Sequence, residues 1–71
     1  MKKGWTAWNV ALWIANDEGL YLTAKDAIRY TKTRGEAARV MLDNLNQSGI
    51  THTPDGAHYT ITSIRAAMRG L

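Results

Sequence analysis

Few side chains in this 71-residue chain have the type and spacing that catalysis or metal binding requires. Ser48 and Ser63 have no histidine and acid at a spacing typical of a nucleophilic site. His52 and His58 are two imidazoles without a third ligand nearby, whereas a zinc site uses three or four protein ligands. The chain also lacks a glycine-rich phosphate loop. We therefore expect no enzymatic activity, no metal and no cofactor.

Basic side chains offer a different chemistry, the binding of phosphate groups. Nine Lys and Arg against six Asp and Glu give a net charge of +3, which permits binding to an anionic polymer without requiring it. Arg39 is the candidate for reading bases, because a guanidinium can bond guanine through two hydrogen bonds. Arg34 would do the same or hold a phosphate. The remaining candidates for phosphate contacts are Lys25, Arg29 and Lys32.

The length and composition describe one domain, residues 1–71, with a small core. Cysteine is absent, so packing must stabilise the fold, and three tryptophans and three tyrosines supply large apolar area. No apolar run approaches the roughly 20 residues that span a membrane, and polar residues near the N-terminus argue against a secretory signal. We therefore expect a cytoplasmic protein, associated with the nucleoid if it binds DNA.

Hydrophobic periodicity predicts a first helix over residues 5–15, with Thr6 as its candidate N-cap. A stripe of apolar side chains at helical spacing is expected to face the core. This stripe consists of Trp5, Trp8, Leu12 and Ala15, with Ala11 and Ile14 beside it. Trp13 lies off the stripe, so we expect it to be exposed and available to a partner.

The second helix has two candidate starts. A capping box of Thr23 and Asp26 places it over residues 24–31, whereas Asp17 as the N-cap would start it earlier. We prefer the later start, because residues 20–22 alternate in an extended pattern.

The third helix has the best-defined ends. Thr33 and Glu36 match a capping box, and Gly49 is the expected left-handed stop. After this stop, Ile50 is expected to fold back onto Leu45 or Met41. The expected inward residues are Ala38, Leu42 and Leu45, with Met41 adjacent to them. The expected outward residues are Arg34, Glu36, Ala37, Arg39, Val40 and Asp43.

The turn signal at residues 53–56 predicts a β-hairpin with strands over 50–53 and 57–62. Pairing across this turn sets His52 opposite His58 and sends residues 50 and 59 to opposite faces. A bulge or a strong twist would resolve this conflict, or residue 50 belongs to the helix end. A last short helix, capped by Thr62 or Ser63, closes the core with a stripe of Ile64, Ala67, Met68 and Leu71.

This order of elements resembles the winged helix-turn-helix family over about residues 8–67. The resemblance is carried by residues 22–26, which open the second helix, by the helix over 34–45 with its end at 49–50, and by the wing pattern of 54–62. It implies an α+β, mainly α fold of three helices, a β-hairpin wing and a short C-terminal helix. It also implies a small bacterial or phage regulator of transcription whose third helix reads the major groove of duplex DNA.

A second resemblance covers residues 4–21, which are similar to the opening of a small phage-encoded protein family of unknown activity. It implies an origin in a mobile element.

The competing hypothesis is a protein-interaction module, for example a phage-encoded protein that binds a host protein. Its anchors would be Trp13, Val40 and Met41, which are also the candidates for a homodimer interface.

Overall fold

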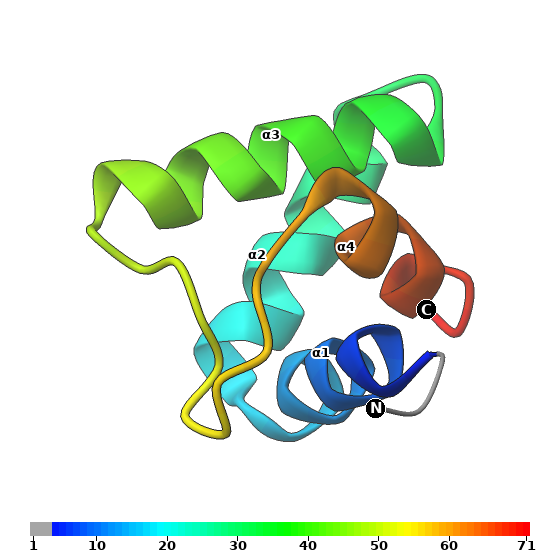
Figure 1. Ribbon diagram of the computed structural model, residues 1–71. Helices are drawn as coiled ribbons and strands as arrows, with labels where there is room; N and C mark the ends of the chain where they lie inside the picture. Colours follow the sequence, from blue (N-terminus) through cyan, green and yellow to red (C-terminus); the bar gives the residue numbers. More distant parts are fainter. Residues whose placement is uncertain (1–3) are drawn as a thin grey trace.

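Four α-helices make up most of the protein, and the structure, a computed structural model, describes residues 4–71. Helix α1 spans Trp5–Asn16, α2 spans Glu18–Arg29, α3 spans Arg34–Gln47 and α4 spans Ile61–Met68. Helices α2 and α4 each pack against both α1 and α3. The loop between α3 and α4 runs down to the corner where α1 meets α2, turns there and returns to α4 (Figure 1). We call this segment, residues 50–60, the hairpin loop.

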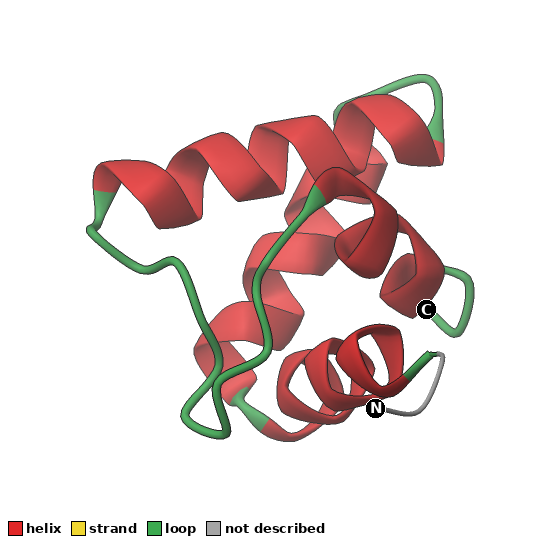
Figure 2. Cartoon of the chain, viewed as in Figure 1, coloured by secondary structure: helices red, strands yellow, loops and turns green. Residues whose placement is uncertain are grey.

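The expected winged helix-turn-helix fold, with its β-hairpin wing, is wrong. The structure has four helices and no sheet over residues 4–71 (Figure 2). The hairpin loop forms one isolated antiparallel bridge, between His52 and His58, as the pairing across the turn predicted. The turn itself is also confirmed, because the Gly56 N–H donates to the Thr53 carbonyl over 2.9 Å. The protein is thus a small all-helical fold in which the predicted wing is a loop.

The first arm of the hairpin loop closes the end of α3, and the second arm caps the start of α4. The Ile50 N–H donates to the Leu45 carbonyl over 2.8 Å, and Gly49 has a φ of 78°, so the first arm starts as the C-terminal cap of α3. Thr60 is the N-cap of α4 and forms a capping box with Ser63, a start that lies earlier in the chain than we expected. Few residues remain for pairing, and a ribbon of two such short arms does not extend into strands without further support.

Helix α2 begins at the earlier of its two candidate starts. Asp17 is extended and acts as the N-cap, where its side chain accepts the Leu20 N–H over 3.0 Å. The preferred start at residue 24 is therefore wrong, and residues 20–22 are helical. Since Asp17 alone separates α1 from α2, the two helices meet at a corner.

The ends of α1 and α3 agree more closely with the sequence. Helix α1 begins at residue 5 as predicted, although Gly4 takes the N-cap position instead of Thr6. Thr33 caps α3 as predicted, with its side chain accepting the Glu36 N–H over 3.1 Å.

The buried side of α1 is only partly the one that its apolar stripe predicts, since Trp5 packs against the core but Trp8 and Leu12 do not. Asn9, Val10 and Ile14 are buried, whereas Trp8 is 60% exposed and Leu12 is 39% exposed. The helix carries apolar side chains around most of its circumference, so periodicity alone does not determine which side docks. The other elements that pack on α1 decide it.

The core consists of small side chains and a few large ones. Six of its buried residues are alanines, which allow the helices to approach closely; they are Ala24, Ala27, Ala37, Ala38, Ala57 and Ala67. The largest side chains with almost no exposed surface are Ile14, Met41, Ile64 and Met68. The buried stripe predicted for the last helix is confirmed at Ile64, Ala67 and Met68.

Candidate functional site

The five basic side chains predicted to bind nucleic acid all lie on the surface. Lys25 and Arg29 are on α2, Lys32 is in the turn, and Arg34 and Arg39 are on α3; all five are exposed. Helices α2 and α3 are separate and are joined by residues 30–33. Each of these cations is therefore accessible to a phosphate in solvent.

Part of this set gathers near the C-terminal end of the chain. Lys25 and Arg29 line a hollow of about 490 Å³ together with Leu71. The Arg34 Nε donates to the Met68 carbonyl over 3.2 Å, which ties the start of α3 to the end of α4. These contacts place three of the five cations around the C-terminal residues, which the sequence did not predict.

Arg39 lies on a different part of the surface, in the middle of the exposed side of α3. Its neighbours on this side are Glu36, Val40 and Asp43, so the face is mixed in charge. Val40 lines a second hollow, between α2 and α3, that Asp26 of α2 also lines. Arg39 lines neither hollow. The candidate base-reading residue is thus presented to solvent, but apart from the cations that line the hollow at the C-terminal end.

The residues predicted to bind a partner differ in how exposed they are. Met41 is fully buried and belongs to the core, which corrects its assignment as an anchor. Ala37, expected to point outward, is fully buried as well. Val40 is 43% exposed and remains available, whereas Trp13 is half-buried and engaged in a hydrogen bond. Among the tryptophans of α1, Trp8 is the most exposed, although the apolar stripe predicted that it faces the core.

A polar network joins α1 to the hairpin loop. The Asn9 side chain is 2% exposed; its Oδ1 accepts the Thr53 hydroxyl over 2.6 Å, and its Nδ2 donates to Asp55 Oδ2 over 2.8 Å. The Trp13 indole N–H donates to the same Asp55 oxygen over 2.9 Å. The Thr53 hydroxyl also accepts the Ala57 N–H over 3.0 Å. The loop is therefore held to the helix by side chains that satisfy one another.

No pattern in the sequence points directly to this network. Its members lie 42 to 46 residues apart in the chain, so no local spacing connects them. The one usable signal is Asn9, a polar residue between apolar neighbours on a helix, since a buried amide must find hydrogen-bond partners. The hydrogen bond from Asn9 is also the main reason that the pKa of Asp55 lies below its usual value, with Trp13 adding to the effect and desolvation opposing it.

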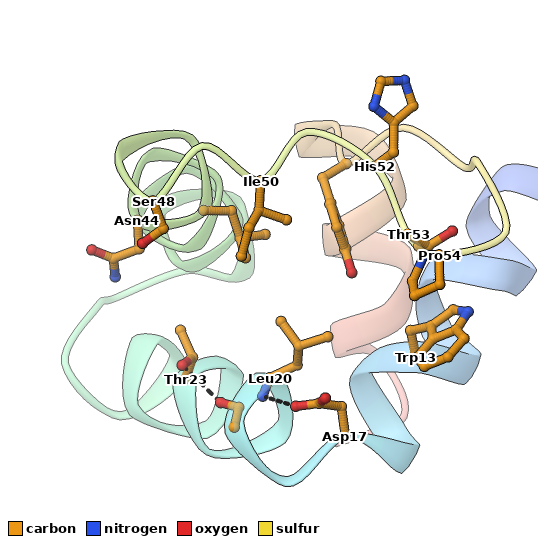
Figure 3. A pocket seen from close by; sticks show the side chains of 13 residues that line it. Trp13, Asp17, Leu20, Thr23, Asn44, Ser48, Ile50, His52, Thr53 and Pro54 are labelled. Carbon is orange, nitrogen blue, oxygen red and sulfur yellow. Dashed lines mark hydrogen bonds between the residues drawn. The ribbon is translucent and has the colours of Figure 1, made fainter.

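A cavity of about 570 Å³ opens at the corner between α1 and α2, beneath the hairpin loop (Figure 3). We call it the corner cavity. Leu20 and Ile50 point into it from opposite sides, and Trp13 and Pro54 form one wall. His52 contributes to the rim, but its ring points away from the cavity (Figure 3). The polar network fixes the same wall, because Trp13 and Thr53 belong to both.

Besides His52 on the rim, the ionisable groups that line the corner cavity are Tyr59 and Asp17, and its other polar side chains are Thr23, Asn44, Ser48 and Thr53. Tyr59 lines the cavity and is 6% exposed, and its hydroxyl makes no hydrogen bond with the described residues. Every fully enclosed side-chain N or O atom in residues 4–71 has a partner, so this hydroxyl must reach open space. Burial raises the pKa of Tyr59, and the negative charge of Asp17 raises it further. The corner cavity is therefore a mainly apolar pocket with one carboxylate, that of Asp17, in its lining.

The two histidines of the hairpin loop contact each other, and Ser63 belongs to a helix cap. The Nε2 atoms of His52 and His58 lie 3.0 Å apart, and the Thr51 hydroxyl lies 2.6 Å from His52 Nδ1. Residues 4–71 contain no group of three or more His, Cys, Asp or Glu placed to hold a metal ion. Ser63 serves in the capping box of α4, which explains its burial. None of the helices over this range is long and apolar enough to cross a membrane.

Comparisons with known proteins place the chain in a family but give no activity. No curated protein and no solved structure matches it. The model of a family of unknown function, DUF7249, matches residues 2–71, which is nearly the whole chain. The corner cavity, the polar network and the basic surface all lie within the matched range. The chain therefore belongs to DUF7249, a family of unknown function.

Proposed function

We propose that this protein binds duplex DNA through the exposed surface of α2, α3 and the turn between them. The observation that supports the proposal best is the exposure of all five basic side chains of this region on two consecutive helices. Two helices joined by a short turn are the unit with which helix-turn-helix proteins place a helix in the major groove. A wing is not needed for this contact. The net charge of +3 favours the approach to a polyanion.

Some of the basic residues would contact phosphates and others would contact bases. Lys25, Arg29 and Lys32 would contact phosphates, which sets affinity and register without reading the sequence. The Nε of Arg34 is engaged with a carbonyl, which leaves the terminal nitrogens of its guanidinium for a phosphate. Arg39 is in the middle of the exposed side of α3, from which a guanidinium reaches base edges in the major groove.

The test is the salt dependence of binding to a random-sequence duplex, measured by fluorescence anisotropy. We expect the affinity to fall steeply as salt rises, and Lys25→Ala to lower the slope of log affinity against log salt by about one. Arg65→Ala is the matched control, because it removes one exposed positive charge from α4. Equal slopes for the protein and Lys25→Ala, or no binding at low salt, would reject the proposal.

Base reading by Arg39 is tested separately, on a duplex selected from a random pool. Arg39→Ala should weaken binding to the selected duplex by about 1–3 kcal/mol and leave binding to random duplexes much less changed. A loss of the same size on both duplexes would show that Arg39 contacts only the backbone.

A second function, protein binding, is favoured by the outer side of α1. Trp8 is 60% exposed and Leu12 is 39% exposed, one turn apart on a helix without a single charged residue. Tryptophan is enriched among the residues that anchor protein interfaces, and the exposed leucine adds apolar surface next to it. Either a second copy of the chain or a host protein would cover this side.

Analytical ultracentrifugation separates these two partners. Concentration-dependent dimers that Trp8→Gln abolishes would support a homodimer through α1. A monomer that forms a stoichiometric, nuclease-resistant complex with one isolated protein, again sensitive to Trp8→Gln, would support a host partner. A monomer whose DNA binding is unaffected by Trp8→Gln leaves DNA binding as the function.

A further inference from the structure

We propose that the corner cavity binds a small primary amine whose positive charge is carried on an apolar body. The cavity lies at the corner between α1 and α2, whereas the basic residues lie on α2, α3 and the turn between them. The proposal therefore does not depend on DNA binding. It rests on the size and walls of the cavity, the rigidity of its rim and the charge of its lining.

The size and walls of the corner cavity suit a small apolar molecule. Its volume of about 570 Å³ is within the range of roughly 300–1,000 Å³ that is typical of small-molecule sites. Its apolar lining comes from three helices and the hairpin loop. These residues are Trp13, Leu20, Leu45, Ile50, Pro54 and Tyr59. Leu20 and Ile50 face each other across the opening, so an apolar ring would lie between them (Figure 3).

The rim of the corner cavity is held in place before any ligand arrives. The hairpin loop is fixed to α1 through Asn9, which bonds both Thr53 and Asp55 at 2.6 and 2.8 Å. Trp13, part of the wall, is oriented by its own hydrogen bond to Asp55. A pocket that needs no ordering on binding loses less free energy to conformational entropy.

The charge of the lining selects for a cation. Asp17 is the one carboxylate among the residues that line the corner cavity, and no Lys or Arg lines it. One oxygen of Asp17 accepts the Leu20 N–H, and the other makes no hydrogen bond with the described residues. The Tyr59 hydroxyl offers a second acceptor within the same lining. An ammonium group donates three hydrogen bonds and carries the complementary charge, which matches these two acceptors.

The test uses three probes of the same size and different charge: 2-phenylethylamine, 2-phenylethanol and phenylacetate. Amide chemical shifts in a ¹H–¹⁵N NMR titration give both the site and the affinity. We expect shifts at the cavity lining, with the amine binding about fivefold to tenfold more tightly than the alcohol and the carboxylate binding most weakly. Asp17→Asn should reduce the affinity for the amine to that for the alcohol and leave the alcohol unchanged.

Two features keep the test interpretable. Asparagine is as good an N-cap as aspartate, so Asp17→Asn removes the charge while the start of α2 is kept. Glu18→Gln is the matched control, since it removes one negative charge from the next residue, which does not line the corner cavity. The proposal is overturned by phenylacetate binding as tightly as the amine, by equal losses in the two variants, or by the absence of shifts at the lining with all three probes.

Discussion

Asp55 is an exposed carboxylate whose hydrogen bonds come from two neutral side chains. Asn9 and Trp13 both donate to its Oδ2, and these bonds favour the ionised form. The folded pKa of Asp55 therefore lies below the ordinary value of 3.8. A group with a lowered pKa contributes stability above its unfolded pKa and loses that contribution as the pH falls through the folded value.

Acidification should consequently remove the advantage of Asp55 over asparagine. At pH 7 the urea midpoint of the protein should exceed that of Asp55→Asn, and the two midpoints should converge as the pH falls below 3.8 and the carboxylate takes up its proton. A gap that keeps its size as the pH falls would mean that the charge of Asp55 does not stabilise the loop.

The pKa of Tyr59 is shifted in the direction opposite to that of Asp55. Burial and then the charge of Asp17 raise its pKa above 10.0, because both disfavour the phenolate. Since the folded pKa is raised, this stabilising contribution is complete below the unfolded pKa and is lost as the pH rises through the folded value.

An alkaline titration followed by tyrosinate absorbance should assign this group. The absorbance step that Tyr59→Phe removes should lie above pH 10, and Asp17→Asn should move the same step toward lower pH. A step that Asp17→Asn leaves in place would show that burial alone raises the pKa of Tyr59, and would weaken the case for an effect of the Asp17 charge in the corner cavity.

At the scale of single elements, two glycines of α3 and its C-terminal end have opposite conformational requirements. Gly49 ends the helix with a φ of 78°, a conformation that costs other residues roughly 1–2 kcal/mol. Gly35 is inside the first turn, where an added Cβ would make an ordinary contact of 3.8 Å with the Thr33 hydroxyl. Gly49→Ala should therefore lower the free energy of unfolding by about 1–2 kcal/mol. Gly35→Ala should raise it by about 0.4–1 kcal/mol. Chemical denaturation measures both, and the same sign for the two variants would contradict the assigned ends of α3.

These local signals explain which elements could be predicted from the sequence. Thr33 and Gly49 mark the ends of α3 through contacts within a few residues, so their roles can be read without the fold. The start of the second helix is ambiguous, because both Asp17 and Thr23 fit the local pattern of an N-cap. The prediction from Thr23 places this start too late in the chain. The ends of a helix are therefore predictable where only one nearby residue fits the pattern of a cap.

Which side of an element is buried, and whether two arms become strands, depend on the rest of the molecule. The outward turn of Trp8 follows from the bonds that Asn9 makes to the distant hairpin loop, which α1 must face. The missing wing follows from Ile50 and Thr60, which serve as helix caps. The exposed cations were predictable because charged side chains rarely enter a core. The corner cavity was not, because its lining comes from segments far apart in the chain.

At the scale of the whole molecule, stability depends on few large side chains. With six alanines in the core, most of the buried apolar area comes from residues such as Ile14, Met41, Ile64 and Met68. Domains are stabilised by roughly 0.05–0.15 kcal/mol per residue, which is about 4–11 kcal/mol for a chain of this length. Removing one large core side chain typically costs about 2–5 kcal/mol. A single truncation therefore takes a large share of the total.

For Met41, its place in the core and the hypothesis that it anchors a partner predict different effects of substitution. As a core residue with no exposed surface, Met41 should lose about 2–5 kcal/mol of unfolding free energy when changed to alanine, and less than about 1.5 kcal/mol when changed to leucine, which has a similar volume. Val40→Ala, on the exposed side of α3, should change it by no more than about 0.5 kcal/mol. Thermal unfolding followed by circular dichroism distinguishes the three variants. If Met41→Ala were as stable as Val40→Ala, Met41 would be a surface residue, and the packing of α3 against α4 would have to be different.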